Sequence, residues 1–350
     1  MPKIRIAGAG ISGLAAAINL AKEGIKTEVF ELNKDCGCRF HGDLQGIENW
    51  SYNREALAHI ESMGIKTDFY HKPVNSVVIT NPHESITIKT SSPSFYLVRR
   101  GSGDRTLDQS LKEQALSCGA RINFSRKLPE NEADITATGP LGREVFGVDS
   151  GIVFQSDMPD TFEMLLGDQF AYRGYSYLLV LDGYACLCTV LFDDFKSVNG
   201  CMRKTKEFFV KKYNLKINSP KTVGGVGHFS VKPTFASGKS LLVGEAAGIQ
   251  DMLFGFGIRS SIHSGYLAAQ SIIDSGDCIK DYEKSAKAAF SGKIKASFVN
   301  RFFWNRMGGD YRPVMKILKK SKNHLKLLKT AYNYNTLHRT CYPLAYAFNR

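Results

Sequence analysis

The 350-residue sequence has no long hydrophobic run, and no stretch approaches the ~18 consecutive apolar residues that a membrane-spanning helix needs. A cleavable leader is also not evident, because an apolar strand is predicted from residue 3 onward. These absences predict a cytoplasmic location. Tryptophan is scarce, with only Trp50 and Trp304 in the chain.

The eight cysteines follow no regular spacing, which fits a reducing compartment better than a disulfide framework. Neither Cys36-Gly-Cys38 nor Cys186-Leu-Cys188 has the two-residue gap that is typical of a zinc site. We therefore expect no metal, and structural roles for Cys186 and Cys188. The chain is long enough to bury a substantial core in one or two domains.

A glycine-rich motif near the N-terminus, Gly8-Ala-Gly10-Ile11-Ser12-Gly13, lies between a predicted strand and a predicted helix. In this setting the pattern G-x-G-x-x-G predicts a dinucleotide site. The first glycine permits the turn, the second lets the backbone approach the pyrophosphate, and the third lets helix and strand pack closely. The free N–H groups of the helix N-terminus attract the phosphates.

An acidic residue follows at the distance that this motif requires. Glu31 stands 18 residues beyond Gly13, at the end of a second predicted strand over 26–30. A carboxylate there can accept hydrogen bonds from the ribose hydroxyls. The motif and Glu31 together predict that the N-terminal part binds the adenosine half of a dinucleotide.

A second glycine-rich segment lies more than two hundred residues later. It reads Leu-Leu-Val-Gly244-Glu245-Ala-Ala-Gly248 and continues to Gly255-Phe-Gly257-Ile258. Between the two segments, a predicted strand over 133–138 ends in Ala-Thr138-Gly139. This order resembles the glutathione-reductase-type flavoproteins of the aromatic hydroxylase branch. The resemblance implies FAD, with Glu245 in the place of the family's Asp, which bonds the ribityl chain.

Two further stretches narrow the resemblance. The segment from Gly248 to Ala269, and the pairing of Arg100 with a helix that begins at 107, look like the geranylgeranyl reductase family, which saturates isoprenoid double bonds. The resemblance covers roughly residues 3–275. It implies a hydrophobic or lipid-like substrate and hydride transfer from reduced flavin to a C=C bond.

The chain departs from that family in one strand. Geranylgeranyl reductases usually carry Tyr-x-Trp-x-Phe-Pro there, whereas this chain has Tyr175-Ser-Tyr177-Leu. Tyr175 and Tyr177 share one face of a strand, so they are either an aromatic wall of a substrate site or an ordinary core pair. Flavin-dependent halogenases would show a Trp-x-Trp-x-Ile-Pro strand. This chain has only Trp50 and Trp304, so that class is disfavoured.

The catalytic candidates are few. A reduction of this kind needs a proton donor, for which Cys36, His41 and Tyr175 are the candidates. Cys36 is included because the family often has a cysteine in the loop after the ribose-binding acid. Arg39 and Arg100 are expected to contact FAD phosphate or the flavin edge, with Arg105 as the alternative to Arg100.

No separate domain for a nicotinamide cofactor is evident in the sequence. The reductant is therefore expected to be NADPH, docking transiently, or an electron-carrier protein. Two other functions stay open. One is a flavin monooxygenase that hydroxylates an aromatic or lipid substrate, and the other is a non-catalytic, flavin-bound, membrane-associated protein.

The net charge of +13 is concentrated at the C-terminal end. Residues 293–350 hold thirteen Lys or Arg and one acid, Asp310, among aromatic and aliphatic residues. Such a basic amphipathic segment can lie on an anionic membrane surface. The alternative is a basic helical segment that packs on its own domain, and a nucleic-acid partner is disfavoured because no base-reading module is visible.

The fold class that follows is α/β. We predict a discontinuous Rossmann-type FAD domain with a parallel sheet over 1–72, 97–148 and 235–275. An antiparallel-sheet substrate domain is predicted over 73–96 and 149–234, followed by a basic helical segment over 276–350. The predicted sheet contains strands 74–80, 85–90, 151–155, 175–181 and 184–192, and residues 224–227 are predicted to form a turn.

Overall fold

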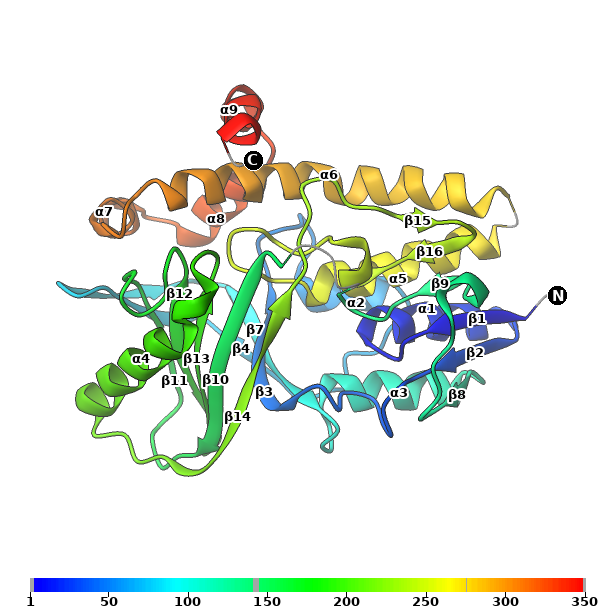
Figure 1. Cartoon of the computed structure of the whole chain (residues 1–350), viewed down its shortest axis with the longest axis horizontal. Coiled ribbons are helices and arrows are strands. Elements are labelled where there is room, and N and C mark those ends of the chain that lie inside the picture. The colour runs from blue at the N-terminus through cyan, green and yellow to red at the C-terminus, as the bar shows by residue number, and fades with distance from the viewer. Residues whose placement is uncertain (1–2, 141–144, 275, 349–350) are drawn as a thin grey trace.

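The computed structural model describes residues 3–140, 145–274 and 276–348, so the predicted domain ends at 1, 275 and 350 lie outside these ranges. In this part of the chain one sheet has six strands, parallel except at its β15 edge (Figure 1). Its spatial order is β15 (Ala236–Ser237), β16 (Ser240–Leu242), β9 (Ile135–Thr136), β1 (Ile4–Ala7), β2 (Thr27–Phe30) and β8 (Arg121–Asn123).

Helix α1 (Ile11–Lys22) packs on β1 and β2 of this sheet, and α3 (Leu107–Ser117) and α5 (Ile258–Ile273) pack against α1. The alanine-rich α1 is buried from Ile11 to Leu20 and packs against both other helices. A Cβ on Gly265 of α5 would lie 2.1 Å from the carbonyl oxygen of Ser12, so α1 and α5 approach closely because this position is glycine. The predicted parallel Rossmann-type region is confirmed.

The second sheet has seven strands among the described residues. Its spatial order is β14 (Asn218–Gly227), β10 (Gly147–Gln155), β13 (Tyr184–Leu191), β12 (Tyr175–Leu181), β11 (Thr161–Leu165), β5 (Ser76–Thr80) and β6 (Ser85–Lys89). Helix α4 (Val198–Tyr213) covers one face and buries Phe209.

Two expectations about this sheet were wrong. Residues 224–227 do not form a turn but the end of β14, because the backbone of β10 pairs with them. The sheet is also not wholly antiparallel, since β5 runs parallel to β11. The separate antiparallel sheet is otherwise confirmed.

A smaller sheet, with three strands in the described part of the chain, packs beside the seven-stranded sheet through β3. It consists of β3 (His41–Glu48), β7 (Phe95–Gly101) and β4 (His71–Val74), with α2 (Ala56–Ser62) following β3. The stretch 74–80, predicted as one strand, is therefore divided between two sheets, with β4 ending at Val74 and β5 beginning at Ser76. The division into domains stays a prediction.

The C-terminal part is helical in the described residues, as predicted. It contains α6 (Cys278–Asn305), α7 (Arg312–Lys320), α8 (His324–Tyr332) and α9 (Thr336–Phe348). Helix α6 runs along the molecule over both large sheets (Figure 1). Three short 3-10 turns complete the elements: η1 (Glu130–Glu132), η2 (Phe195–Ser197) and η3 (Gly244–Ala247). Within the residues that the structure describes, no helix has the length and apolarity to cross a bilayer.

Candidate active site

A cavity of about 470 Å³ lies between the six-stranded sheet and the seven-stranded sheet. One end of its lining is polar and includes the glycine motif, Glu31, Arg39 and Glu245. The other end is formed by apolar residues of the second sheet and of the loop before α5. Most residues proposed from the sequence line this cavity: Gly8, Gly10, Ile11, Ser12, Glu31, Arg39, Arg100, Thr138, Gly139, Tyr175, Glu245, Gly257 and Ile258.

The glycine motif has the geometry that a close approach to phosphate requires. Gly8 has a φ of +98°, and a Cβ there would lie 2.5 Å from the carbonyl oxygen of Ala137. Gly10 is the N-cap residue of α1 and no side chain caps the helix, so its first N–H groups are available to a ligand. Gly13 does not line the cavity. A Cβ on it would lie 2.2 Å from the oxygen of Gly8, so it permits the packing of helix on strand.

Glu31 is fixed at the edge of this motif. Its Oε2 accepts a hydrogen bond from the backbone N–H of Ala9 at 2.9 Å. Its Oε1 accepts from the backbone and side-chain amides of Asn33 at 2.9 and 2.8 Å. The carboxylate is therefore positioned beside the glycine turn, where the sequence predicts a ribose.

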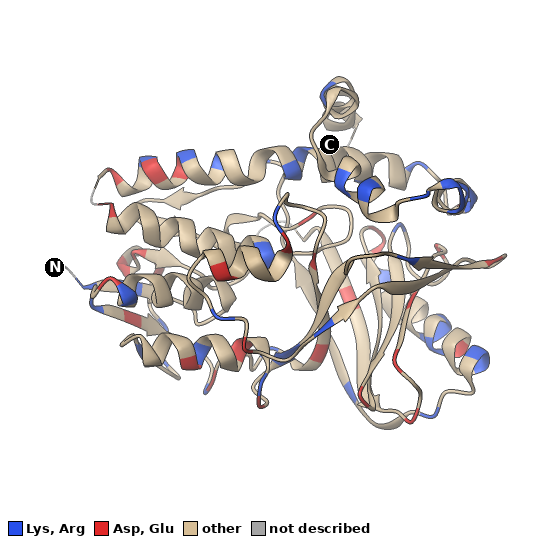
Figure 2. Ribbon diagram, turned by 180° about the vertical axis from the view of Figure 1, so that it is seen from behind, with Lys and Arg blue, Asp and Glu red and all other residues tan. Residues whose placement is uncertain are grey.

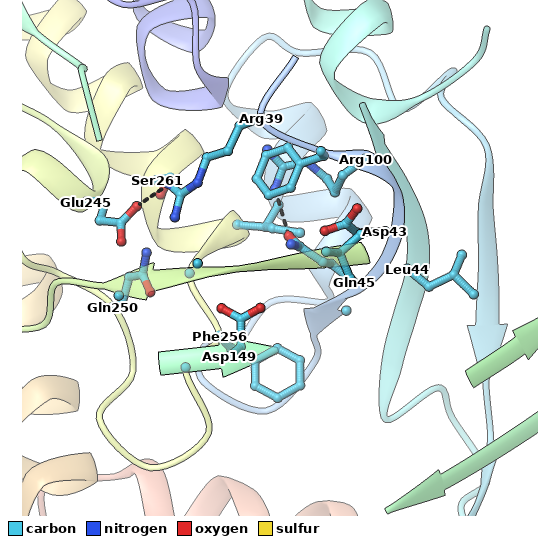
Figure 3. A pocket seen from close by; sticks show the side chains of 18 of the residues that line it. Arg39, Asp43, Leu44, Gln45, Arg100, Asp149, Glu245, Gln250, Phe256 and Ser261 are labelled. Carbon is cyan, nitrogen blue, oxygen red and sulfur yellow. Dashed lines mark hydrogen bonds and ion pairs between the residues drawn. The ribbon is translucent and has the colours of Figure 1, made fainter. Parts of the chain in front are cut away.

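Arg39 and Glu245 meet across the cavity (Figure 3). The Arg39 guanidinium donates to Oε2 of Glu245 at 3.1 Å and to the carbonyl of Val226 at 3.1 Å. Oε1 of Glu245 accepts from the backbone N–H of His228 at 3.1 Å. Gly244, which precedes the acid, lies behind the wall, where a Cβ would come within 2.6 Å of the Ser12 hydroxyl.

Arg100 has a different environment from Arg39. It is buried, and its guanidinium donates to both carboxylate oxygens of Asp108, at 2.8 and 2.9 Å, and to Gln45 at 2.8 Å. The carboxylate of Asp108 therefore neutralises the positive charge of Arg100 within the wall of the cavity. Arg105, the alternative, is exposed and lies over the ring of Tyr70 instead.

The three proton-donor candidates are not brought together. Cys36 is buried behind the lining, where burial raises the pKa of its thiol and its carbonyl accepts from Gln109. His41 is exposed, and its carbonyl accepts from the Tyr184 hydroxyl. Tyr175 does line the cavity. Its hydroxyl donates to the carbonyl of Phe254, and burial raises the pKa of Tyr175, so the phenol is neutral.

The apolar end of the cavity is rich in aromatic and aliphatic groups. Tyr175 and Tyr177 both face it, as the strand period predicts, with ring centroids 6.2 Å apart. The other apolar lining residues at this end come from four elements and the loop before α5: Phe95, Phe162, Met164, Leu179, Val190, Phe254 and Phe256. This end can hold an apolar molecule and exclude water.

Two acids in the cavity were not found from the sequence. Burial raises the pKa of Asp149 to about 6, and burial also raises the pKa of Asp43. Asp149 comes from β10, whose first residues the sequence did not place in a strand, and Asp43 comes from β3. The sequence gives one local indication of Asp149, which is a charged residue between two glycines in Gly147-Val-Asp149-Ser-Gly151.

Comparisons with known proteins agree with the fold. A family model described as an NAD(P)-binding Rossmann-like domain matches residues 6–59. A geranylgeranyl bacteriochlorophyll reductase-like protein from Thermoplasma acidophilum is similar in structure, with a TM-score of 0.75, 19% identity and 98% of each chain covered. No curated protein sequence matches the chain.

Two other solved structures are similar over most of their length. A flavin-dependent brominase has a TM-score of 0.67 and 14% identity, with 99% of each chain covered. A probable FAD-dependent monooxygenase from Pseudomonas aeruginosa has a TM-score of 0.62 and 11% identity, with 91% of this chain and 99% of that chain covered. At these identities the likeness shows a shared fold. The glycine motif, Glu31 and Glu245 that line the cavity are of the residue types that suit FAD.

Proposed function

We propose that the protein is an FAD-dependent oxidoreductase that reduces C=C bonds of an isoprenoid or another lipid-like molecule. The observation that supports this most is the continuity of one cavity, polar at the glycine motif and apolar at the sheet. A dinucleotide cofactor suits the first part and a hydrocarbon suits the second. The likeness to a geranylgeranyl bacteriochlorophyll reductase-like protein favours the same class of reaction.

The geometry of the cavity supports a set of expected contacts to the cofactor. The N-terminus of α1 and Gly10 are expected to bind the pyrophosphate, and Glu31 the ribose. Glu245 is expected to accept from the ribityl hydroxyls, with Arg39 beside it. When bound, FAD supplies hydride transfer, and this chain supplies orientation and a dry cavity.

The proposal also includes the source of the electrons and a second candidate reaction. In the part of the chain that the structure describes there is no second Rossmann-type sheet, so NADPH docking transiently or an electron-carrier protein is the expected reductant. A flavin monooxygenase is the second candidate, because a probable FAD-dependent monooxygenase shares the fold. It would use the same contacts to FAD.

The proposal is tested by the cofactor and by its reoxidation. The purified protein is expected to be yellow and to release FAD on denaturation. After anaerobic reduction, geranylgeraniol in detergent micelles is expected to reoxidise the flavin. NAD without flavin in the native protein would contradict the proposal at its first step. Reoxidation by oxygen alone would contradict the choice of C=C reduction.

We also propose that the C-terminal helices attach the protein to an anionic membrane, from which a lipid substrate can be taken. Several basic and aromatic residues of the C-terminal segment are buried and therefore cannot contact a membrane. Phe302 and Trp304 are buried, as are Arg301 and the ammonium group of Lys293. Arg350 lies outside the described residues.

The exposed part of the C-terminal segment still has an interfacial composition. Its large exposed apolar residues are Phe303, Ile317, Leu337, Leu344 and Phe348. Exposed lysines of α7 stand beside Ile317, and Lys or Arg residues are frequent on α7 and α8 (Figure 2). Each such charge near an anionic surface is worth about 1 kcal/mol.

Charge reversal tests this attachment better than truncation, because α6 belongs to the core. The triple variant K316E/K320E/K322E is expected to lose most binding to phosphatidylserine-containing vesicles. The matched control K204E/K206E/K211E reverses three exposed charges on α4 and is expected to sediment like the wild type. Equal sedimentation of both variants would contradict a specific role of the C-terminal helices.

A further inference from the structure

One carboxyl group projects from an otherwise uncharged part of the seven-stranded sheet. Asp149 of β10 pairs with Val190 of β13 on one side and with Gly225 of β14 on the other. Two neighbouring rows across these strands contain Gly225, Asp149, Val190 and Tyr175, then Val223, Gly151, Cys188 and Tyr177. All of these except Gly151 line the cavity, and among these eight positions Asp149 is the only charged one.

The surroundings leave Asp149 room to reach a bound molecule. Gly225 has no side chain, and a Cβ there would lie 3.3 Å from Nη2 of Arg39 and 3.7 Å from Oδ1 of Asp149. The glycine-rich end of β14 thus keeps this part of the cavity open. Figure 3 shows Asp149 directed into the same space as Arg39, Gln45 and Gln250.

The groups that face Asp149 favour its protonated form. The pKa of Asp149 is raised to about 6, first by burial, which the charge of Arg39 opposes, and then by the nearby carboxylates of Asp43 and Glu245. The Arg39 charge is shared with Glu245, to which it is hydrogen-bonded at 3.1 Å.

The remaining neighbours carry no charge that would remove the proton. The Cys188 thiol lies 3.9 Å from Oδ2 of Asp149. Burial raises the pKa of Cys188, of Tyr175 and of Tyr177, so all three stay neutral. With a pKa of about 6, Asp149 therefore takes up and releases a proton in the mildly acidic range, beside the apolar end of the cavity.

We propose that Asp149 is the general acid of this cavity and protonates one carbon of a bound C=C bond, while the other carbon receives a hydride from reduced flavin. This inference rests on the proposed function. In this step the π bond, the Asp149 O–H bond and the N–H bond of the reduced flavin that supplies the hydride would break, and two C–H bonds would form. The two electrons come from the flavin, which is left oxidised. Asp149 is left as a carboxylate and regains a proton from water.

The variant D149N tests this step because it keeps the shape of the side chain and removes its acid. The protein is reduced anaerobically and mixed with geranylgeraniol micelles from about pH 5 to about pH 9. The wild-type reoxidation rate is expected to fall as the pH rises through about 6, since the donor must be protonated. D149N is expected to be slower by about 10²-fold or more and to lose this inflection, with FAD still bound. A rate within about threefold of wild type, with the same inflection, would overturn the proposal.

The variant D43N is the matched comparison, because Asp43 is a second carboxyl in the same cavity with a pKa raised by burial. Asp43 accepts a hydrogen bond from the backbone N–H of His41 at 2.8 Å. The inflection is expected to persist in D43N. If it disappears there and persists in D149N, the acid is Asp43 and the assignment to Asp149 is wrong.

A failure of the proposed function can be told apart from a failure of this assignment. If geranylgeraniol does not reoxidise the wild-type flavin, C=C reduction of this substrate class is contradicted. The absorbance of the bound oxidised flavin is then titrated from about pH 4.5 to about pH 8. A transition near pH 6 that D149N abolishes supports an acid at this position, and identical titrations of wild type and D149N overturn it.

Discussion

Arg39 and Glu245 stand 206 residues apart in the sequence and form an ion pair 3.1 Å long in the wall of the cavity. The first lies in the loop between β2 and β3, and the second lies in the 3-10 turn η3 after β16. Their contact joins the loop after β2 to the second glycine-rich segment in the wall of one cavity. A substitution on either side is therefore expected to affect the same ligand.

Removing the carboxylate of Glu245 is expected to weaken FAD binding. In Glu245→Ala the ribityl hydroxyls lose a charged acceptor, which costs about 1–3 kcal/mol, or roughly 5- to 150-fold in Kd. Glu245→Asp is expected to bind nearly as well as the wild type, because it keeps a carboxylate. Fluorescence titration of the deflavinated protein measures both constants. An unchanged Kd in the alanine variant would show that this segment does not contact the cofactor.

Gly10→Val is expected to abolish FAD binding without unfolding the protein. A Cβ at this position would lie 3.7 Å from the carbonyl oxygen of Ala137, which is an ordinary contact, and the branched side chain beyond it is expected to occupy the approach of the pyrophosphate. The purified variant should be colourless and have a Tm close to that of the deflavinated wild type. A yellow variant with stoichiometric FAD would count against the phosphate site.

Gly265→Ala is expected to destabilise the packing of α1 against α5. The new Cβ would lie 2.1 Å from the carbonyl oxygen of Ser12, and overpacking of this kind costs about 1–3 kcal/mol. The control Gly200→Ala in α4 meets nothing within 4 Å and is expected to gain about 0.5–1 kcal/mol from helix propensity. Urea unfolding of both variants gives the free energies. Equal values would contradict close contact of the two helices.

Stability is expected to fall below pH 6.5 because two partly buried histidines, His59 and His263, are neutral in the folded state. Burial lowers the pKa of His59 to about 4 and of His263 to about 3. Nδ1 of His59 accepts a hydrogen bond from Arg259 at 3.1 Å, which requires the neutral ring. The unfolded chain takes up protons below its histidine pKa, so the free energy of unfolding declines as pH falls from about 6.5 toward 4, by at most about 1.4 kcal/mol per pH unit for each histidine.

The variant His263→Gln is expected to reduce this slope, and His83→Gln, at an exposed position, is expected to keep it. Urea unfolding at a series of pH values measures the slope for each protein. If the wild type has the same stability at pH 4.5 as at pH 6.5, or if both variants keep the full slope, the histidines are not neutral in the folded state.

The sequence predicted the cofactor end of the cavity because its signals are local. The glycine motif and Glu31 lie within 24 residues of one strand–helix–strand unit, where the chain itself determines the contacts. Tyr175 and Tyr177 were placed on one face by the strand period alone. The parallel sheet was expected from the strand–helix–strand setting of the glycine motif and from the family resemblance, and the second sheet from short runs of strand-forming residues.

The rest of the site depends on pairings between distant segments. Asp149 faces the cavity because β13 and β14 flank its strand, and no local pattern reports those partners. Arg100 forms an ion pair with Asp108, at the start of α3, so its charge is neutralised within the wall of the cavity. Gly265, which lies within the segment that resembles geranylgeranyl reductases, has a packing role against Ser12.

The contacts of the C-terminal segment also could not be predicted from a local pattern. Its basic and aromatic residues predict an amphipathic surface, yet α6 packs against α5, α8 and α9 and buries several of them. Trp304 joins Trp50, Tyr311 and Tyr332 in one core cluster. Periodicity alone does not show how many faces of a helix are covered.

The most direct test of the central claim is the mass of the product after a single anaerobic turnover. The protein is reduced, mixed with geranylgeraniol without oxygen, and the lipid is extracted for mass spectrometry. The proposed function predicts a product that is two hydrogen atoms heavier than the substrate, with its hydride derived from the reduced flavin. A product that forms only when oxygen is admitted, and that carries one added oxygen atom, would contradict it and assign the protein to the monooxygenases.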